Sequence, residues 1–95
     1  MDLSEATKIV DAEIEALRRI PYSELRDLAR EHATKTSRHA GRSDVQYCLE
    51  VQFFFDGLEG KDVRVLAAID DGGLRALHPL TRSFIKGPDD VFIGE

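Results

Sequence analysis

The chain of 95 residues lacks the features that mark several large classes of protein. It has one cysteine, no tryptophan and three prolines. The lone Cys48 excludes an internal disulfide, so we expect a reducing, cytoplasmic setting rather than a disulfide-stabilised secreted domain. No apolar run approaches the roughly 18 residues of a membrane span, and the acidic first residues are unlike a secretory signal. We therefore expect no membrane partner.

Positive charge is also in the minority. Eighteen acidic residues against 13 basic ones give a formal net charge of -5. An acidic domain repels phosphate backbones, so the composition predicts no nucleic-acid partner. The chain is long enough for a single domain with a modest core, and we treat residues 1–95 as one domain.

Motifs that hold metals, phosphates or nucleophiles are missing as well. The three histidines and Cys48 do not stand at spacings that place two metal ligands on one element. The glycines form no phosphate-binding loop, and no serine lies in the motif of serine hydrolases. We expect no metal and no cofactor, and we name no catalytic residue. The acidic pairs 70–71 and 89–90 are typical of turns, where aspartates bond to their own backbone.

Two helices are predicted in the first third of the chain. Apolar residues recur at helical spacing over residues 3–19, and Asp2 followed by Glu5 suits the start of a helix. Pro21 ends this segment, because the residue before a proline avoids the helical region. A second helix is expected over about residues 23–33, and residues 34–44 are interpreted as a loop.

From Val45 the pattern changes to strict alternation, which predicts strands. We expect strands over residues 45–55, 63–70 and about 74–78, with a tight hairpin at Asp71-Gly72. The last residues could form a small terminal hairpin or cover one end of the core. The predicted fold is therefore α+β, with two N-terminal helices packed on one face of an antiparallel meander of three to four strands.

The expected loop carries the only locally basic stretch of the sequence. No acidic residue interrupts it before Asp44. Such a segment could bind a phosphate or an acidic partner, although a solvated surface loop is the commoner reading, and no aromatic residue is interleaved to stack on nucleobases. The candidate anion-binding residues are Lys35, Arg38, His39 and Arg42.

The outer face of the predicted sheet carries apolar residues where polar ones are expected. A connection centred near Glu59 places Gln52 opposite Leu66 and Phe54 opposite Arg64, and the tight hairpin places Leu66 opposite Leu77. We therefore expect an interaction surface made of Phe54, Leu66 and Leu77. The alternative is that the C-terminal residues fold over it.

Three strings of the sequence resemble a family of small uncharacterised bacterial proteins. They are IPYSELR at residues 20–26, VQFFFDG at 51–57, and DVRVLAAIDDGGLRALHPLTRSFI at 62–85. The resemblance covers most of the chain from Ile20 onward, and it implies a bacterial, self-contained domain. It implies no activity, ligand or catalytic residue.

Three functions remain open at this level. The first is a small cytoplasmic protein-interaction module, non-enzymatic and homodimeric. The second is a ligand-binding or enzymatic domain with a pocket between a curled sheet and the helices, lined by Tyr22, Tyr47 and His78. The third is an acidic, immunity-like or inhibitor-like protein that masks a basic partner.

Overall fold

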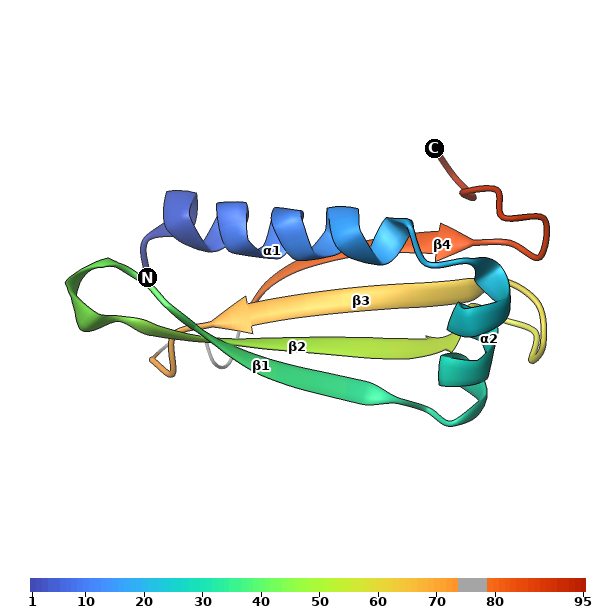
Figure 1. Ribbon diagram of the computed structural model, residues 1–95, viewed down its shortest axis with the longest axis horizontal. Coiled ribbons are helices and arrows are strands. Elements are labelled where there is room, and N and C mark those ends of the chain that lie inside the picture. Colours follow the sequence, from blue (N-terminus) through green and yellow to red (C-terminus); the bar gives the residue numbers. More distant parts are fainter. Residues whose placement is uncertain (74–78) are drawn as a thin grey trace.

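The computed structural model describes residues 1–73 and 79–95 of the chain. Two helices, α1 (Leu3–Arg18) and α2 (Tyr22–Arg30), precede a four-stranded antiparallel sheet. Both helices lie on one side of this sheet, as Figure 1 shows, and the α+β prediction is confirmed. The strands follow chain order across the sheet and are β1 (Thr34–Ala40), β2 (Gln46–Phe55), β3 (Val63–Asp70) and β4 (Leu80–Lys86).

The core lies between the helices and the facing side of β2, β3 and β4. Alternate residues of β2 and β3 are buried because successive side chains of a strand point to opposite faces. Helix α1 packs on β3 and β4, while α2 packs on β2 and β3. The largest fully buried side chains are Tyr47, Phe53, Leu25, Leu49, Ile69, Val10, Val63 and Val65.

Both helix boundaries follow from local backbone chemistry. The Asp2 carboxylate accepts a hydrogen bond from the Glu5 amide at 3.1 Å, which caps α1 as expected. Helix α2 ends before the predicted residue 33, because His32 takes a left-handed conformation with φ of 50°. The Ala33 amide then reaches back to the carbonyl of Leu28 at 2.9 Å, which closes the carboxyl end of the helix.

The register of β2 and β3 agrees with the prediction. Gln52 lies opposite Leu66, and Phe54 lies opposite Arg64. Alternation on both strands fixes this register, since a shift of one residue would turn the apolar side chains toward solvent.

The prediction of a loop over residues 34–44 is wrong for most of its length. Residues Thr34–Ala40 form β1, which pairs antiparallel with β2, and only the short 3₁₀ turn η1 (Arg42–Asp44) follows it. None of the seven side chains of β1 is buried. The strand therefore lacks the alternation of apolar and polar residues that identifies a half-buried strand in a sequence.

The connection from β3 to β4 is longer than the expected tight hairpin. Ile69 lies opposite Leu80 rather than Leu74, and Leu66 lies opposite Ser83 rather than Leu77. The predicted strand over residues 74–78 lies outside the described residues. The glycines after β3 form local turns instead, in which the Gly72 amide donates to the Asp70 carboxylate at 2.8 Å.

The C-terminal residues turn back and run beside β4. The Gly87 amide donates to the Val91 carbonyl at 2.8 Å, and the Ile93 amide donates to the Ile85 carbonyl at 2.9 Å. Phe92 packs edge-on against Phe84, with ring centroids 5.7 Å apart. This segment is thus both a small terminal hairpin and a cover for one end of the core.

Lys86, the last residue of β4, contacts the end of α1 and Asp90 of the C-terminal segment, and Asp90 in turn contacts the start of α2. Its side chain is 7% exposed, and its Nζ donates to the carbonyls of Arg18 at 2.9 Å and Ile20 at 2.8 Å, just where α1 ends. Asp90 lies 3.8 Å from the same Nζ and accepts a hydrogen bond from the Tyr22 amide at 2.7 Å, where α2 begins. A cation at the end of one helix and an anion at the start of the next both complement the helix dipoles.

We predict that Lys86→Met lowers the free energy of unfolding by about 2–3 kcal/mol, because two carbonyls lose a charged donor. Urea denaturation followed by circular dichroism measures the change. Lys61→Met, at an exposed position, is the control and should change this free energy by less than about 0.5 kcal/mol. Equal effects of the two substitutions would contradict the role given to Lys86.

Candidate functional site

Among the described residues, strand β1 forms one edge of the sheet and pairs only with β2. The Phe53 amide donates to the Ala33 carbonyl at 3.1 Å, and the Gly41 amide donates to the Val45 carbonyl at 2.7 Å. Hydrogen-bonded pairs alternate along an antiparallel ladder, so these two bonds place the odd-numbered residues of β1 in contact with β2. The outward-facing amides and carbonyls are those of Thr34, Thr36, Arg38 and Ala40.

The opposite edge of the sheet is partly covered by its own chain. Ile93 bonds to Ile85 on the outer side of β4, and Phe92 bridges to Lys86. Arg18 holds this segment in place, since its guanidinium makes two hydrogen bonds to the Glu95 carboxylate and lies 3.7 Å from the centroid of the Phe92 ring. The Arg18 contact also lowers the pKa of Glu95. Among the described residues, no segment covers β1 in this way.

Three of the four predicted anion-binding residues, Lys35, Arg38 and His39, therefore lie on a sheet edge rather than on a loop. Lys35 and His39 point to the helix side, where Lys35 Nζ lies 5.7 Å from the centroid of the Phe53 ring. Arg38 points to the open face of the sheet. In the part of the chain that the structure describes, neither Lys35 nor Arg38 forms an ion pair. Arg42 follows in η1, where its amide donates to the Glu5 carboxylate at 3.0 Å.

The open face of the sheet carries two residues of the predicted interaction surface. Phe54 and Leu66 are half-buried diagonal neighbours on β2 and β3, and Leu77 lies outside the described residues. Ile85 of β4 takes the third corner, opposite Arg64. Arg64 lies among the three and pairs with Asp56 at 2.9 Å, so this apolar surface is interrupted by a charge.

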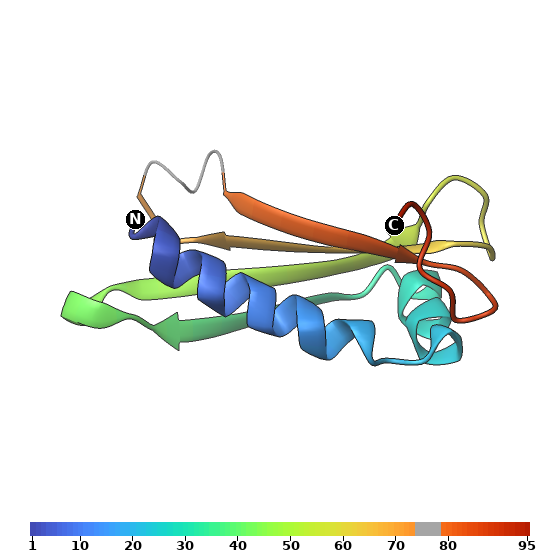
Figure 2. The same ribbon diagram turned by 90° about the horizontal axis from the view of Figure 1, so that it is seen from above.

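Hollows border β1 at both of its ends. One hollow of about 390 Å³ lies between α1 and the end of β1, with Ile9, Ala12 and His39 on its walls. Two further hollows of about 260 and 290 Å³ lie at the start of β1 and share His32 and Phe54. Figure 2 shows β1 at one margin of the sheet, running from α2 toward the end of the molecule where α1 begins.

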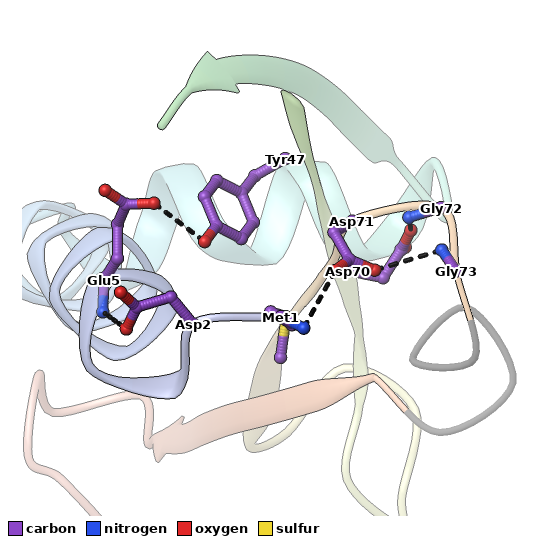
Figure 3. A network of polar contacts seen from close by, with 8 residues as sticks. All are labelled: Met1, Asp2, Glu5, Tyr47, Asp70, Asp71, Gly72 and Gly73. Carbon is purple, nitrogen blue, oxygen red and sulfur yellow. Dashed lines mark hydrogen bonds and ion pairs between the residues drawn. The ribbon is translucent and has the colours of Figure 1, made fainter. Parts of the chain in front are cut away.

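Tyr47 and Glu5 make a partly buried polar contact near the N-terminus, drawn in Figure 3. The Tyr47 hydroxyl donates to the Glu5 carboxylate at 2.8 Å, and burial together with this bond raises the pKa of Tyr47 to about 12. A side chain at Gly41 would collide with both the carboxylate and the ring, so only glycine fits there. Glu5 thus connects α1 to the end of β1. Its two carboxylate oxygens already accept hydrogen bonds from the Arg42 amide and the Tyr47 hydroxyl.

The carboxylates of Asp70 and Asp71 also form local contacts. The Asp71 carboxylate accepts a hydrogen bond from the Gly73 amide at 3.0 Å and lies 3.2 Å from the amino group of Met1. These contacts hold the pKa of Asp71 below its usual value, with the Gly73 bond the larger cause. Within residues 1–73 and 79–95, the side chains form no cluster of three or more potential metal ligands.

The tyrosines expected in a ligand pocket lie at opposite ends of the molecule. The Tyr22 hydroxyl donates to the carbonyl of Lys61 beside the β2–β3 loop, whereas Tyr47 contacts Glu5 near the start of α1. Neither tyrosine lines the hollows beside β1 or the one between α1 and η1, and His78 lies outside the described residues. The sheet and helices therefore do not bring Tyr22 and Tyr47 into one pocket.

Comparison of the chain with protein-family models, with curated proteins and with solved structures gives no match. None of the helices in the described part of the chain is both long and apolar enough to cross a membrane.

Sequence reasoning identified the basic residues but missed the sheet edge that carries them. The side-chain sequence does not indicate that the amides of Thr34 and Thr36 face outward, because their direction depends on which strand pairs with β1. The hollow beside His32 and Phe54 was missed for a similar reason, since it depends on where α2 ends.

We predict that the free energy of unfolding falls as the pH rises from about 10 to about 12. The unfolded chain loses its tyrosine proton near pH 10, whereas Tyr47 in the folded chain keeps its proton to about 12. High pH therefore favours the unfolded state. In Tyr47→Phe the free energy of unfolding should fall less steeply over the same pH range. Denaturation curves across this range measure both slopes. Equal slopes in the parent protein and in Tyr47→Phe would contradict this role for Tyr47.

Proposed function

We propose that this protein is a small interaction module that binds an extended segment of a partner protein along β1. The observation that carries the proposal is the free edge of β1, whose amides and carbonyls at Thr34, Thr36, Arg38 and Ala40 face away from the sheet. A peptide strand added there would satisfy these groups by main-chain hydrogen bonds. The free Cys48 supports a reducing setting, so we place the module in the cytoplasm.

The charge of β1 indicates the chemistry of the partner. Strand β1 contains the basic residues Lys35 and Arg38 together with His39, and no acidic residue, although the whole chain carries a net charge of -5. The nearest acid on the open face, Glu50, lies opposite Thr36 and accepts a hydrogen bond from Gln52 at 2.8 Å. An added strand with acidic side chains would place them beside Lys35 and Arg38. The partner segment is therefore acidic as well as extended.

A second copy of the chain is the competing occupant of the same edge. Two β1 strands can pair antiparallel about Ser37, which places Arg38 of one copy opposite Thr36 of the other. The pairing gives a twofold dimer, as the sequence led us to expect. It also brings the basic residues of both copies together, and for this reason we favour the acidic segment.

The peptide acetyl-Thr-Glu-Glu-Val-Thr-Glu-Ala-Thr-Thr-amide tests the proposal. Paired antiparallel with β1, it places glutamates opposite His39, Arg38 and Lys35. We expect it to bind, and to bind about tenfold more weakly when NaCl is raised from about 50 to about 500 mM, because salt screens exposed ion pairs. Isothermal titration calorimetry measures the affinity, and amide exchange at Thr36 and Arg38 should slow. The same peptide with lysine in place of each glutamate should not bind.

Thr36→Pro separates strand addition from simple charge attraction. Proline removes an amide that faces outward, so the sheet should remain intact while the added strand loses one of its bonds. We expect peptide binding to be lost in Thr36→Pro and kept in Thr36→Ala, with unchanged circular dichroism in both. Binding that survives in the proline variant would contradict strand addition. Sedimentation equilibrium of the protein alone completes the test, since a dimer abolished by Thr36→Pro would make a second copy the occupant.

A further inference from the structure

We infer that the segment bound along β1 carries a large apolar side chain just after its acidic residues, and that this side chain enters the hollow beside Phe54. The inference rests on the proposed function and adds the feature that selects one acidic segment over another. In strand addition the main chain supplies affinity, and pockets for individual side chains supply specificity.

The hollow beside Phe54 consists of the two adjoining hollows at the start of β1, which share His32 and Phe54. Its larger part, about 290 Å³, is bordered by Thr34 and Gln52 of the open face together with Ala33, Phe53 and Phe54. The adjoining part, about 260 Å³, reaches Ala29 of α2 and Phe55. His32 borders both parts, in the left-handed conformation that ends α2 and turns the chain toward β1. The chain thus leaves this space unfilled because α2 stops before it reaches the sheet edge.

Its walls suit an apolar side chain with polar surroundings. Phe54 and Phe55 are only half-buried, and Ala29 and Ala33 are too small to fill the space between α2 and the sheet. Arg30 and Glu59, of opposite charge, border the outer part. Beside Glu59 in the β2–β3 loop, Leu58 is 73% exposed, so further apolar surface gathers at this end. An apolar centre with a polar rim is the usual anatomy of a protein-binding surface.

The direction of the partner follows from the direction of β1. Every neighbouring pair of strands in this sheet is antiparallel, and antiparallel pairing is the slightly stronger arrangement. A partner that runs against β1 passes Arg38 first, then Lys35, and reaches Thr34 last. The apolar residue therefore follows the acidic residues in the sequence of the partner. Opposite Thr34 it points to the open face, where Phe54 also lies.

Three acidic peptides test the inference. The first is the alanine-containing peptide described above. The second replaces that alanine, which faces Thr34, by phenylalanine, and we expect it to bind about tenfold more tightly because an apolar side chain leaves water. The third keeps the alanine and places phenylalanine in the first position, opposite Ala40, where it should give no gain. Isothermal titration calorimetry at one salt concentration compares the three.

Phe54→Ala is the matched protein variant, since Phe54 lies on the open face and outside the buried core. It should abolish the gain from the phenylalanine opposite Thr34 and leave the affinity for the alanine peptide unchanged. A gain that persists in Phe54→Ala, an equal gain from the first position, or no gain at all would overturn the inference. If the alanine peptide binds in any of these cases, strand addition itself stands. If none of the three peptides binds, strand addition fails as well.

Discussion

The contact of Lys86 with the end of α1 decides where both helices lie on the sheet. Lys86 is the last residue of β4, and its Nζ bonds to the carbonyls of Arg18 and Ile20. Asp90, four residues later, caps α2. The end of α1 and the start of α2 are thereby held beside the end of β4. Two helices of 16 and nine residues held there cover β2, β3 and β4, and they leave β1 without a buried side chain.

An uncovered strand must be held by something other than apolar burial, and in β1 this is the ladder to β2. Glu5 adds a second attachment, because it bonds to Tyr47 of β2 and to the amide of Arg42 just beyond β1. Gly41 allows this approach, as any side chain there would meet Glu5 and the Tyr47 ring. The edge strand is thus anchored at its end through α1, while its outward amides stay unpaired among the described residues. A binding edge needs both properties, since a strand that frays cannot serve as a template for another.

The sequence predicted those parts of the fold in which burial dictates the side chains. Leu49, Val51 and Phe53 alternate with the polar Glu50 and Gln52 because one face of β2 is in the core, so both the strand and its register with β3 could be predicted from the sequence. In β1 both faces are open, and the same reasoning gave a loop. The prediction of the connection after β3 was wrong for another reason. Asp70-Asp71-Gly72-Gly73 suits a tight hairpin, yet the two carboxylates bond to the glycine amides, and these local turns do not require pairing of the flanking residues.

The same bases that attract an acidic segment also oppose pairing of β1 with itself. In a twofold pair about Ser37, Lys35 would face His39 of the second copy, and no acid lies between Thr34 and Ser43 to offset these charges. Charged residues at a free edge are a common means of preventing such pairing. The net charge of -5 does not reverse the preference for an acidic partner. At physiological ionic strength charges are screened over about 8 Å, so a strand in contact with β1 is affected by Lys35 and Arg38 far more than by acids across the molecule. Local charge, rather than net charge, therefore determines which strand this edge accepts.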